Sequence, residues 1–136
     1  MKNLLLICLL ILSITLIDAY SKDKKVKIDV MYFHTTVRCE GCLKIEEHTF
    51  NSIKDVFEKE LKDSTITVKS IDFWEEGNEH FEKAYKFDTQ TLILSKKVNG
   101  KEVKWKNLDK IFEYAGNYLH FQKYLKKEID IFLKKK

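Results

Sequence analysis

The sequence predicts a single α/β domain in which strands and helices follow the order β-α-β-α-β-β-α, with an additional helix at the C-terminus. Three observations carry this prediction. β-branched apolar runs recur along the chain, helical periodicity follows the first of them, and an Asn-Gly pair joins the last two. Two strand–helix–strand crossovers followed by a hairpin form a mixed sheet with helices on both faces.

The composition is that of an ordinary globular domain. Hydrophobic residues make up 44% of the 136 residues and charged residues 34%, so low hydrophobicity does not predict disorder. The net charge of +4 comes from lysines interspersed with acidic residues, and Arg38 is the only arginine. Because no stretch combines clustered arginines with stacking aromatics, we expect no nucleic-acid partner.

The first 21 residues have the pattern of a secretory signal peptide. Lys2 precedes an apolar run over 4–17, and the small residues Ala19 and Ser21 follow it. The run is shorter than the roughly 20 apolar residues that span a bilayer, so an uncleaved membrane anchor is the alternative. We expect residues 22–136 to form the domain, exported to the periplasm or another extracytoplasmic compartment where disulfides persist.

The first strand is expected at 26–34, where alternating apolar residues become nearly continuous, as in a strand inside a sheet. A polar loop over 35–38 follows. From Cys39 onward apolar residues recur every three or four positions, which predicts one long helix. Its apolar face is expected to consist of Leu43, Phe50, Ile53, Phe57 and Leu61. A second strand is expected at 65–72.

The second half of the domain is expected to contain a hairpin between helices. Asn78 is predicted to cap a short helix that ends at Tyr85. Strands at 91–95 and 101–105 flank Asn99-Gly100, which favours a type I′ turn because both residues tolerate a positive φ. Asn107 is predicted to cap the next helix. The last helix is expected to bury Tyr118, Phe121, Leu125, Ile129 and Phe132.

The chemically informative motif is Cys39-Glu40-Gly41-Cys42, at the junction of the first strand and the long helix. Cys8 lies in the apolar run and would leave with the signal peptide. Unpaired N–H groups in the first turn of a helix favour a thiolate. We therefore expect Cys39 to be the exposed attacking thiol and Cys42 the more buried resolving thiol.

Charged neighbours are expected to modulate this site. Arg38 adjoins Cys39 and would lower the pKa of its thiol, whereas Glu40 would raise it. The sequence leaves open which of the two effects is larger.

Two other uses of the same cysteines remain open. In some exported proteins a Cys-x-x-Cys pair is a static cross-link. In others such a pair binds a metal; here His34, Cys39 and Cys42 would bind copper or zinc, with Glu46 and His48 as weaker candidate ligands. Cys-Glu-Gly-Cys resembles the loop of heavy-metal-associated domains, but the long helix and the closing hairpin do not fit that fold.

The order of elements, the position of the cysteine pair and a later segment resemble the thioredoxin superfamily. That segment is Thr89-Gln90-Thr91 followed by a strand and Gly100-Lys101-Glu102-Val103. The resemblance implies a thioredoxin-like three-layer sandwich. Gln90 stands where the family has its cis-proline, beside Thr91, so we expect trans peptides there. Phe33 stands where thioredoxins carry a buried acid, and neither Phe33 nor its neighbour Tyr32 supplies a carboxylate.

Within the superfamily, three segments resemble a group of small exported bacterial proteins, the ArsF-type subunits of a nitrophenyl-compound nitroreductase. These segments are Tyr32-Phe33-His34, Arg38-Cys39-x-x-Cys42-x-x-Ile45-Glu46 and the stretch 104–111 around Trp105 and Leu108. The resemblance implies an association with redox or arsenical metabolism. No flavin-binding feature is evident.

The sequence therefore predicts a thioredoxin-like protein that exchanges thiols and disulfides through Cys39 and Cys42 with an unidentified protein partner, without a bound cofactor. A metal- or metalloid-binding accessory protein, and a non-catalytic subunit of a redox complex, are the alternatives.

Overall fold

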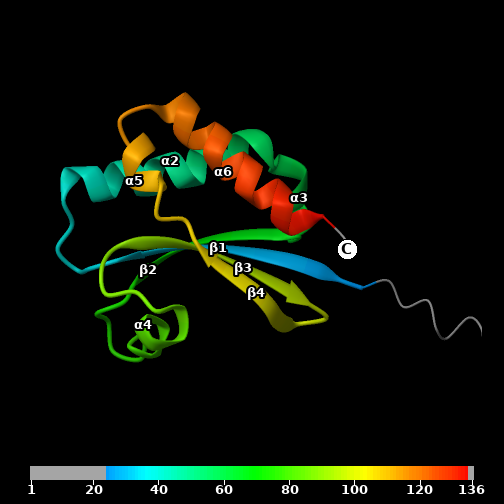
Figure 1. Ribbon diagram of the computed structural model, residues 1–136, viewed down its shortest axis with the longest axis horizontal. Helices are drawn as coiled ribbons and strands as arrows, with labels where there is room; N and C mark the ends of the chain where they lie inside the picture. The colour runs from blue at the N-terminus through cyan, green and yellow to red at the C-terminus, as the bar shows by residue number, and fades with distance from the viewer. Residues whose placement is uncertain (1–23, 135–136) are drawn as a thin grey trace, which may run out of the picture.

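The computed structural model describes residues 24–134, which form a four-stranded sheet with helices on both faces (Figure 1). The predicted signal peptide over 1–21 lies outside the described residues. Among residues 24–134, no helix is long and apolar enough to cross a membrane.

The strands lie in the spatial order β2-β1-β3-β4. They span Val26–His34 (β1), Ile66–Asp72 (β2), Thr91–Val98 (β3) and Lys101–Asn107 (β4). β1 pairs parallel with β2 and antiparallel with β3, and β3 pairs antiparallel with β4. The predicted mixed α/β architecture is confirmed, and β1 is an inner strand with neighbours on both sides.

The helices are distributed unequally between the two faces of the sheet. One face carries α2 (Glu40–Val56), α3 (Glu58–Lys62), α5 (Ile111–Tyr114) and α6 (Tyr118–Leu133) (Figure 1). The other face carries the short helix α4 (His80–Tyr85). The molecule is thus a sandwich of helices, sheet and a single small helix.

Each face of β1 supports a separate hydrophobic core. Ile28, Val30 and Tyr32 are fully buried against α2 and α6. Met31 and Phe33 point to the opposite face, where they pack with side chains from the loops that flank α4. β1 is apolar on both faces because successive side chains of a strand point to opposite sides.

The β3–β4 turn has the predicted geometry. Asn99 and Gly100 have φ angles of 52° and 82°, as a type I′ turn requires. The N–H of Asn99 donates to the carbonyl of Lys25 at 2.9 Å, and the N–H of Lys25 donates to Oδ1 of Asn99 at 3.1 Å. The turn therefore also holds the start of β1.

The predicted long helix is two helices, and its buried face differs from the expected one. The helix breaks at Phe57, whose φ of −126° and ψ of 34° are not helical. Leu43 and Phe50 are exposed, and the buried positions of α2 are Cys42, Ile45, Thr49, Ser52 and Ile53. The burial of Cys42 and Ile45 on the face toward the sheet leaves Leu43, between them in sequence, on the exposed side of the helix.

The two predicted asparagine caps are wrong. Asn78 Nδ2 donates to the carbonyl of Asp72 at 2.8 Å, and α4 begins without a side-chain cap. Asn107 is the last residue of β4, and its Oδ1 accepts a hydrogen bond from the Thr91 hydroxyl. In both cases a bond to a neighbouring strand has replaced the local cap. The actual cap of α6 is Asn117, which accepts from the N–H of His120.

The correction to the buried face of α2 predicts the effect of two substitutions. Ile53→Ala removes a fully buried side chain between helix and sheet, so we expect it to lower the free energy of unfolding by about 2–5 kcal/mol. Leu43→Ala removes a side chain that is 48% exposed, and we expect a change of about 0.5 kcal/mol or less. Urea denaturation of both variants measures the difference. A larger loss for Leu43→Ala would contradict the observed helix orientation.

Candidate functional site

The cysteine pair lies where the chain leaves β1 and enters α2. Cys39 is the N-cap residue of α2, with extended backbone angles, and Cys42 lies in its first turn. The loop 35–38 connects the pair to His34, the last residue of β1. The buried strand and the amphipathic helix therefore fix the positions of both cysteines.

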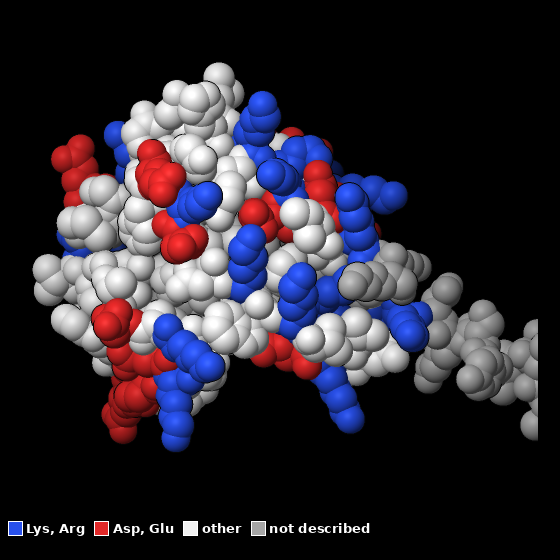
Figure 2. Space-filling model, viewed as in Figure 1, with Lys and Arg blue, Asp and Glu red and all other residues white. Residues whose placement is uncertain are grey.

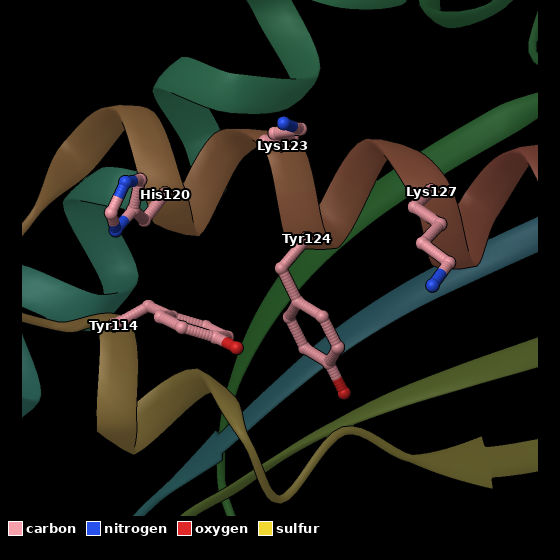
Figure 3. Close-up of a pocket in the computed structure, with 5 residues that line it drawn as sticks. All are labelled: Tyr114, His120, Lys123, Tyr124 and Lys127. Atoms are coloured by element: carbon pink, nitrogen blue, oxygen red, sulfur yellow. The ribbon is translucent and has the colours of Figure 1, made fainter.

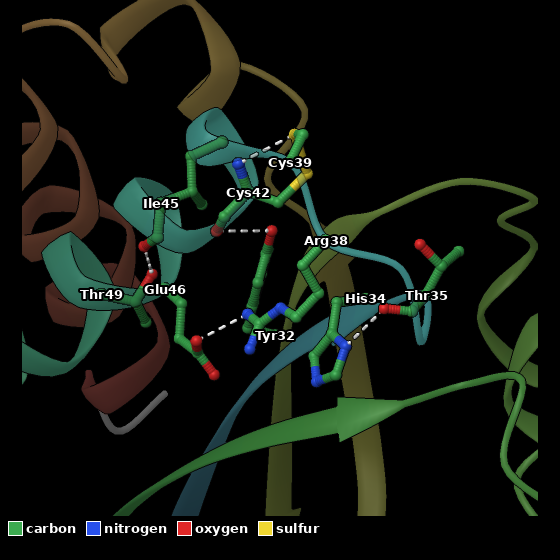
Figure 4. Close-up of polar contacts among 9 residues, drawn as sticks. All are labelled: Tyr32, His34, Thr35, Arg38, Cys39, Cys42, Ile45, Glu46 and Thr49. Atoms are coloured by element: carbon green, nitrogen blue, oxygen red, sulfur yellow. Dashed lines mark hydrogen bonds and ion pairs between the residues drawn. A yellow bond between two sulfur atoms is a disulfide. The ribbon is translucent and has the colours of Figure 1, made fainter.

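Cys39 and Cys42 form a disulfide, with their Cα atoms 5.1 Å apart. Cys39 is exposed, whereas Cys42 is only 7% exposed. The Sγ of Cys39 accepts a hydrogen bond from the N–H of Cys42 at 3.1 Å (Figure 4). The structure thus brings the expected pair together, with an accessible first sulfur that an unpaired helix N–H stabilises.

Arg38 does not point at the sulfurs. Its guanidinium turns beneath the loop toward α2, and Nη2 lies 2.5 Å from Oε2 of Glu46 (Figure 4). The two side chains are only 21% and 22% exposed. The charge of Arg38 is thus largely compensated by Glu46, and the expected direct effect of Arg38 on the Cys39 thiol is weakened.

Glu46 stays ionised in this environment. Burial raises the pKa of its carboxyl, but the Ser70 hydroxyl and the Arg38 guanidinium outweigh burial and hold the pKa below its ordinary value of 4.5. A largely buried carboxylate therefore lies one helical turn beyond Cys42, although β1 supplies none at Phe33.

Tyr32 connects the sheet to the cysteine turn. Its side chain is fully buried, and its hydroxyl donates to the carbonyl oxygen of Cys42 at 3.0 Å (Figure 4). Burial raises the pKa of this hydroxyl to about 12, although the charge of Arg38 acts in the opposite direction. Tyr32 is therefore a neutral hydrogen-bond donor and a poor base near neutral pH.

His34 faces away from the disulfide. Its Nδ1 donates to the carbonyl of Thr35 at 3.0 Å, and its ring points away from both sulfurs (Figure 4). The structure thus does not bring His34 together with Cys39 and Cys42. Within residues 24–134, no three His, Cys, Asp or Glu side chains are grouped so as to hold a metal ion.

Gln90 and Thr91 lie at the same end of the sheet as the cysteine loop. Nε2 of Gln90 donates to the Thr35 hydroxyl at 3.3 Å, which joins the two loops. The described residues contain no cis peptide bond, so the expected trans peptides at Gln90 and Thr91 are confirmed. Thr91 is buried, and its hydroxyl donates to Oδ1 of Asn107 on β4.

The outer surface beside the disulfide is apolar as well as charged. Val37 is 79% exposed and Leu43 48% exposed, on either side of the pair in sequence. Glu40 is exposed in the first turn of α2, where solvent screens its carboxylate. The segment that carries the pair thus exposes aliphatic as well as charged side chains.

The charged side chains are less evenly distributed than the sequence indicates. Figure 2 shows lysines gathered toward the end of the sheet where β1 begins and the β3–β4 turn lies, while acidic side chains gather over α4. The exposed lysines at the first end include Lys24, Lys25, Lys101 and Lys104. The cysteine loop lies at the opposite end of β1 from this lysine-rich end.

A separate cavity of about 360 Å³ lies between α5 and α6 (Figure 3). It is lined by Tyr114, His120, Lys123, Tyr124 and Lys127. Burial, together with the nearby carboxylates of Glu128 and Asp109, raises the pKa of the Tyr124 hydroxyl to about 12.

Sequence reasoning missed two residues of the site. Glu46 was expected only as a weak metal ligand, and Tyr32 was not expected to hold Cys42. The signal for Glu46 was its position four residues after Cys42, on the same side of the helix. The signal for Tyr32 was the alternation of side chains along the first strand, which places Tyr32 on the face that α2 covers.

Comparisons with known proteins leave the family open. No protein-family model matches the chain, and no curated protein matches it. The chain is similar to a solved structure described as "Structure of a malarial protein", with 18% sequence identity and a TM-score of 0.47. The match covers 79% of this chain and 99% of the other.

The Arg38–Glu46 pair predicts a pH-dependent contribution to stability. Because the folded pKa of Glu46 lies below its ordinary value, its carboxylate stabilises the fold above pH 4.5 and loses this effect as the pH falls through the folded pKa. We expect Glu46→Gln to lower the free energy of unfolding by about 1–3 kcal/mol at pH 7. The difference from the unsubstituted protein should shrink below pH 4.5.

Urea denaturation at pH 7 and at pH 3 checks this prediction. Glu58→Gln is the matched control, since Glu58 forms an exposed ion pair with Lys62 on α3, where an ion pair contributes little. A stability difference for Glu46→Gln that stays constant with pH would contradict the assigned role of its charge.

Proposed function

We propose that the protein has a thioredoxin-like fold and exchanges thiols and disulfides with a protein partner through Cys39 and Cys42. The observation that carries the proposal is the asymmetry of the pair: the Cys39 sulfur is accessible at a helix N-terminus, and Cys42 is buried behind it. An accessible sulfur stabilised by N–H groups attacks or is attacked, and a buried neighbour resolves the mixed disulfide.

The surroundings of the pair support this proposal. The strand order β2-β1-β3-β4 and the sequence of helices are compatible with what the resemblance implies. Gln90 occupies the position of the family's cis-proline, and its trans backbone implies that a partner chain is received differently there. The partner is proposed to be an exported protein, because the N-terminal 21 residues have the pattern of a signal peptide.

The chemical step transfers two electrons. The Cys39 thiolate attacks one sulfur of a partner disulfide, forms a mixed disulfide and releases a partner thiolate. The Cys42 thiolate then attacks the Cys39 sulfur, forms the internal disulfide and releases the second partner thiolate. The partner is reduced and the protein is oxidised, and the reverse sequence oxidises the partner.

The first test uses the different exposure of the two thiols. With Cys8→Ser present throughout, Cys42→Ala is expected to stop at a mixed disulfide on Cys39 when treated with oxidised glutathione. Cys39→Ala is expected to react about 100-fold more slowly, because Cys42 is only 7% exposed. Mass spectrometry of acid-quenched samples measures both adducts. Equal reactivity of the two variants would contradict the assignment of attacking and resolving thiols.

The second test separates exchange from the alternatives. Equilibration in graded glutathione buffers gives the reduction potential, and we expect a value above about −300 mV, since structural disulfides lie below it. Metal analysis of protein purified anaerobically tests the metal-binding alternative. Stoichiometric copper or zinc that is lost in Cys39→Ser would overturn the proposed exchange function.

A further inference from the structure

Contacts other than the disulfide also hold the two ends of the cysteine segment together. Arg38 immediately precedes Cys39, and Glu46 lies one helical turn beyond Cys42. Their ion pair, with Nη2 and Oε2 2.5 Å apart, therefore encloses both cysteines in a non-covalent ring over residues 38–46 (Figure 4). Tyr32 adds an attachment from the sheet, because its hydroxyl binds the Cys42 carbonyl at 3.0 Å.

The ring lies partly shielded from water. The side chains of Arg38 and Glu46 are about four-fifths buried, and Tyr32 is fully buried. Shielding strengthens an ion pair relative to a surface pair, and removing one partner leaves the other charge buried without compensation. Nε and Nη2 of Arg38 are buried and form no hydrogen bond within residues 24–134, so Glu46 compensates this guanidinium by its charge, through the ion pair, and not through a well-formed hydrogen bond.

Two hydrogen bonds also hold the outer part of the loop over 35–38 in place. The Thr35 hydroxyl donates to the carbonyl of Val37 at 2.8 Å and accepts from Nε2 of Gln90 at 3.3 Å. None of these contacts changes chemically when the disulfide is reduced. The backbone that carries the two cysteines is thus held by contacts that reduction of the disulfide does not itself remove.

We infer that Arg38, Glu46 and Tyr32 are positioning residues for the resolving step: they keep Cys42 within reach of Cys39 while no covalent bond joins them. The inference rests on the proposed exchange function. Attack of Cys42 on the mixed disulfide is intramolecular, so its rate depends on how well the two sulfurs are pre-aligned. Attack of Cys39 on an external disulfide does not depend on that alignment.

The two steps respond differently to loss of the ring. In the first, the Cys39 thiolate forms a bond to one glutathione sulfur and expels the other as a thiolate. In the second, the Cys42 thiolate bonds to the Cys39 sulfur and expels the bound glutathione thiolate. Glu46→Gln should leave the first step within about threefold and slow the second by about 10- to 100-fold.

Rapid-quench kinetics with oxidised glutathione test this inference. Fully reduced protein carrying Cys8→Ser is mixed with an excess of the probe, quenched with acid at intervals and analysed by mass spectrometry. The population of the glutathione adduct gives the rates of formation and resolution separately. In Glu46→Gln and Arg38→Gln we expect the adduct to accumulate, and in the unsubstituted protein to remain scarce.

Control variants distinguish a positioning role from a general loss of folded structure. Arg38→Lys retains a positive charge and is expected to recover most of the resolving rate. Glu58→Gln removes an ion pair of the same charge type on α3 and is expected to change neither rate. Tyr32→Phe deletes one hydroxyl from a buried ring and keeps the inference testable if Glu46→Gln is poorly folded. It should slow the resolving step by about three- to tenfold.

The outcomes distinguish this inference from the proposed function. If oxidised glutathione does not convert the unsubstituted protein to the internal disulfide, the exchange function itself is wrong. If it does, and the Glu46→Gln and Tyr32→Phe variants resolve the adduct as fast as the unsubstituted protein, only the positioning role is wrong. Equal slowing of both steps in these variants would likewise overturn the positioning role, since that pattern indicates loss of structure.

Discussion

The burial of β1 on both faces is the constraint on which the rest of the structure depends. Its side chains Ile28, Val30 and Tyr32 belong to the core beneath α2 and α6, and Met31 and Phe33 belong to the core beside α4. β1 also pairs with both of its neighbours in the sheet. A strand held on four sides has a defined end, and the chain leaves that end at His34 only a few residues before Cys39. The packing and pairing of the central strand therefore fix the position of the cysteine site.

The sequence predicted the elements better than their orientation. Period-two and period-3.6 patterns located the four strands and the main helices, because these patterns record the burial of apolar side chains, which drives folding more than any other interaction. The rotation of α2 escaped prediction, since Leu43 and Phe50 share a spacing with Ile53 that suggests a common face. The buried face of α2 instead includes Cys42 and the polar residues Thr49 and Ser52, whose burial depends on tertiary contacts that a local apolar pattern does not contain.

In the candidate site, too, the positions of the residues were predicted, but their tertiary contacts were not. The spacing and position of Cys39 and Cys42, and their unequal exposure, followed from the behaviour of a helix N-terminus. The partner of Arg38 did not, because an ion pair between a loop and a helix depends on how the loop folds back. Asn78 and Asn107 were misassigned for a related reason. An asparagine bonds equally well to a helix N–H or to a neighbouring strand, and only the tertiary structure distinguishes these partners.

The link between the β3–β4 turn and the start of β1 has a consequence for the order of assembly. Asn99 and Lys25 are 74 residues apart in sequence, so closing this contact requires a large loss of chain entropy. Cys39 and Cys42 are separated by only three positions, and their encounter costs far less. During synthesis from the N-terminus, both cysteines emerge before β2 and β3, which pair with the two edges of β1. The two thiols can therefore meet on a nascent chain before either edge of the central strand is paired.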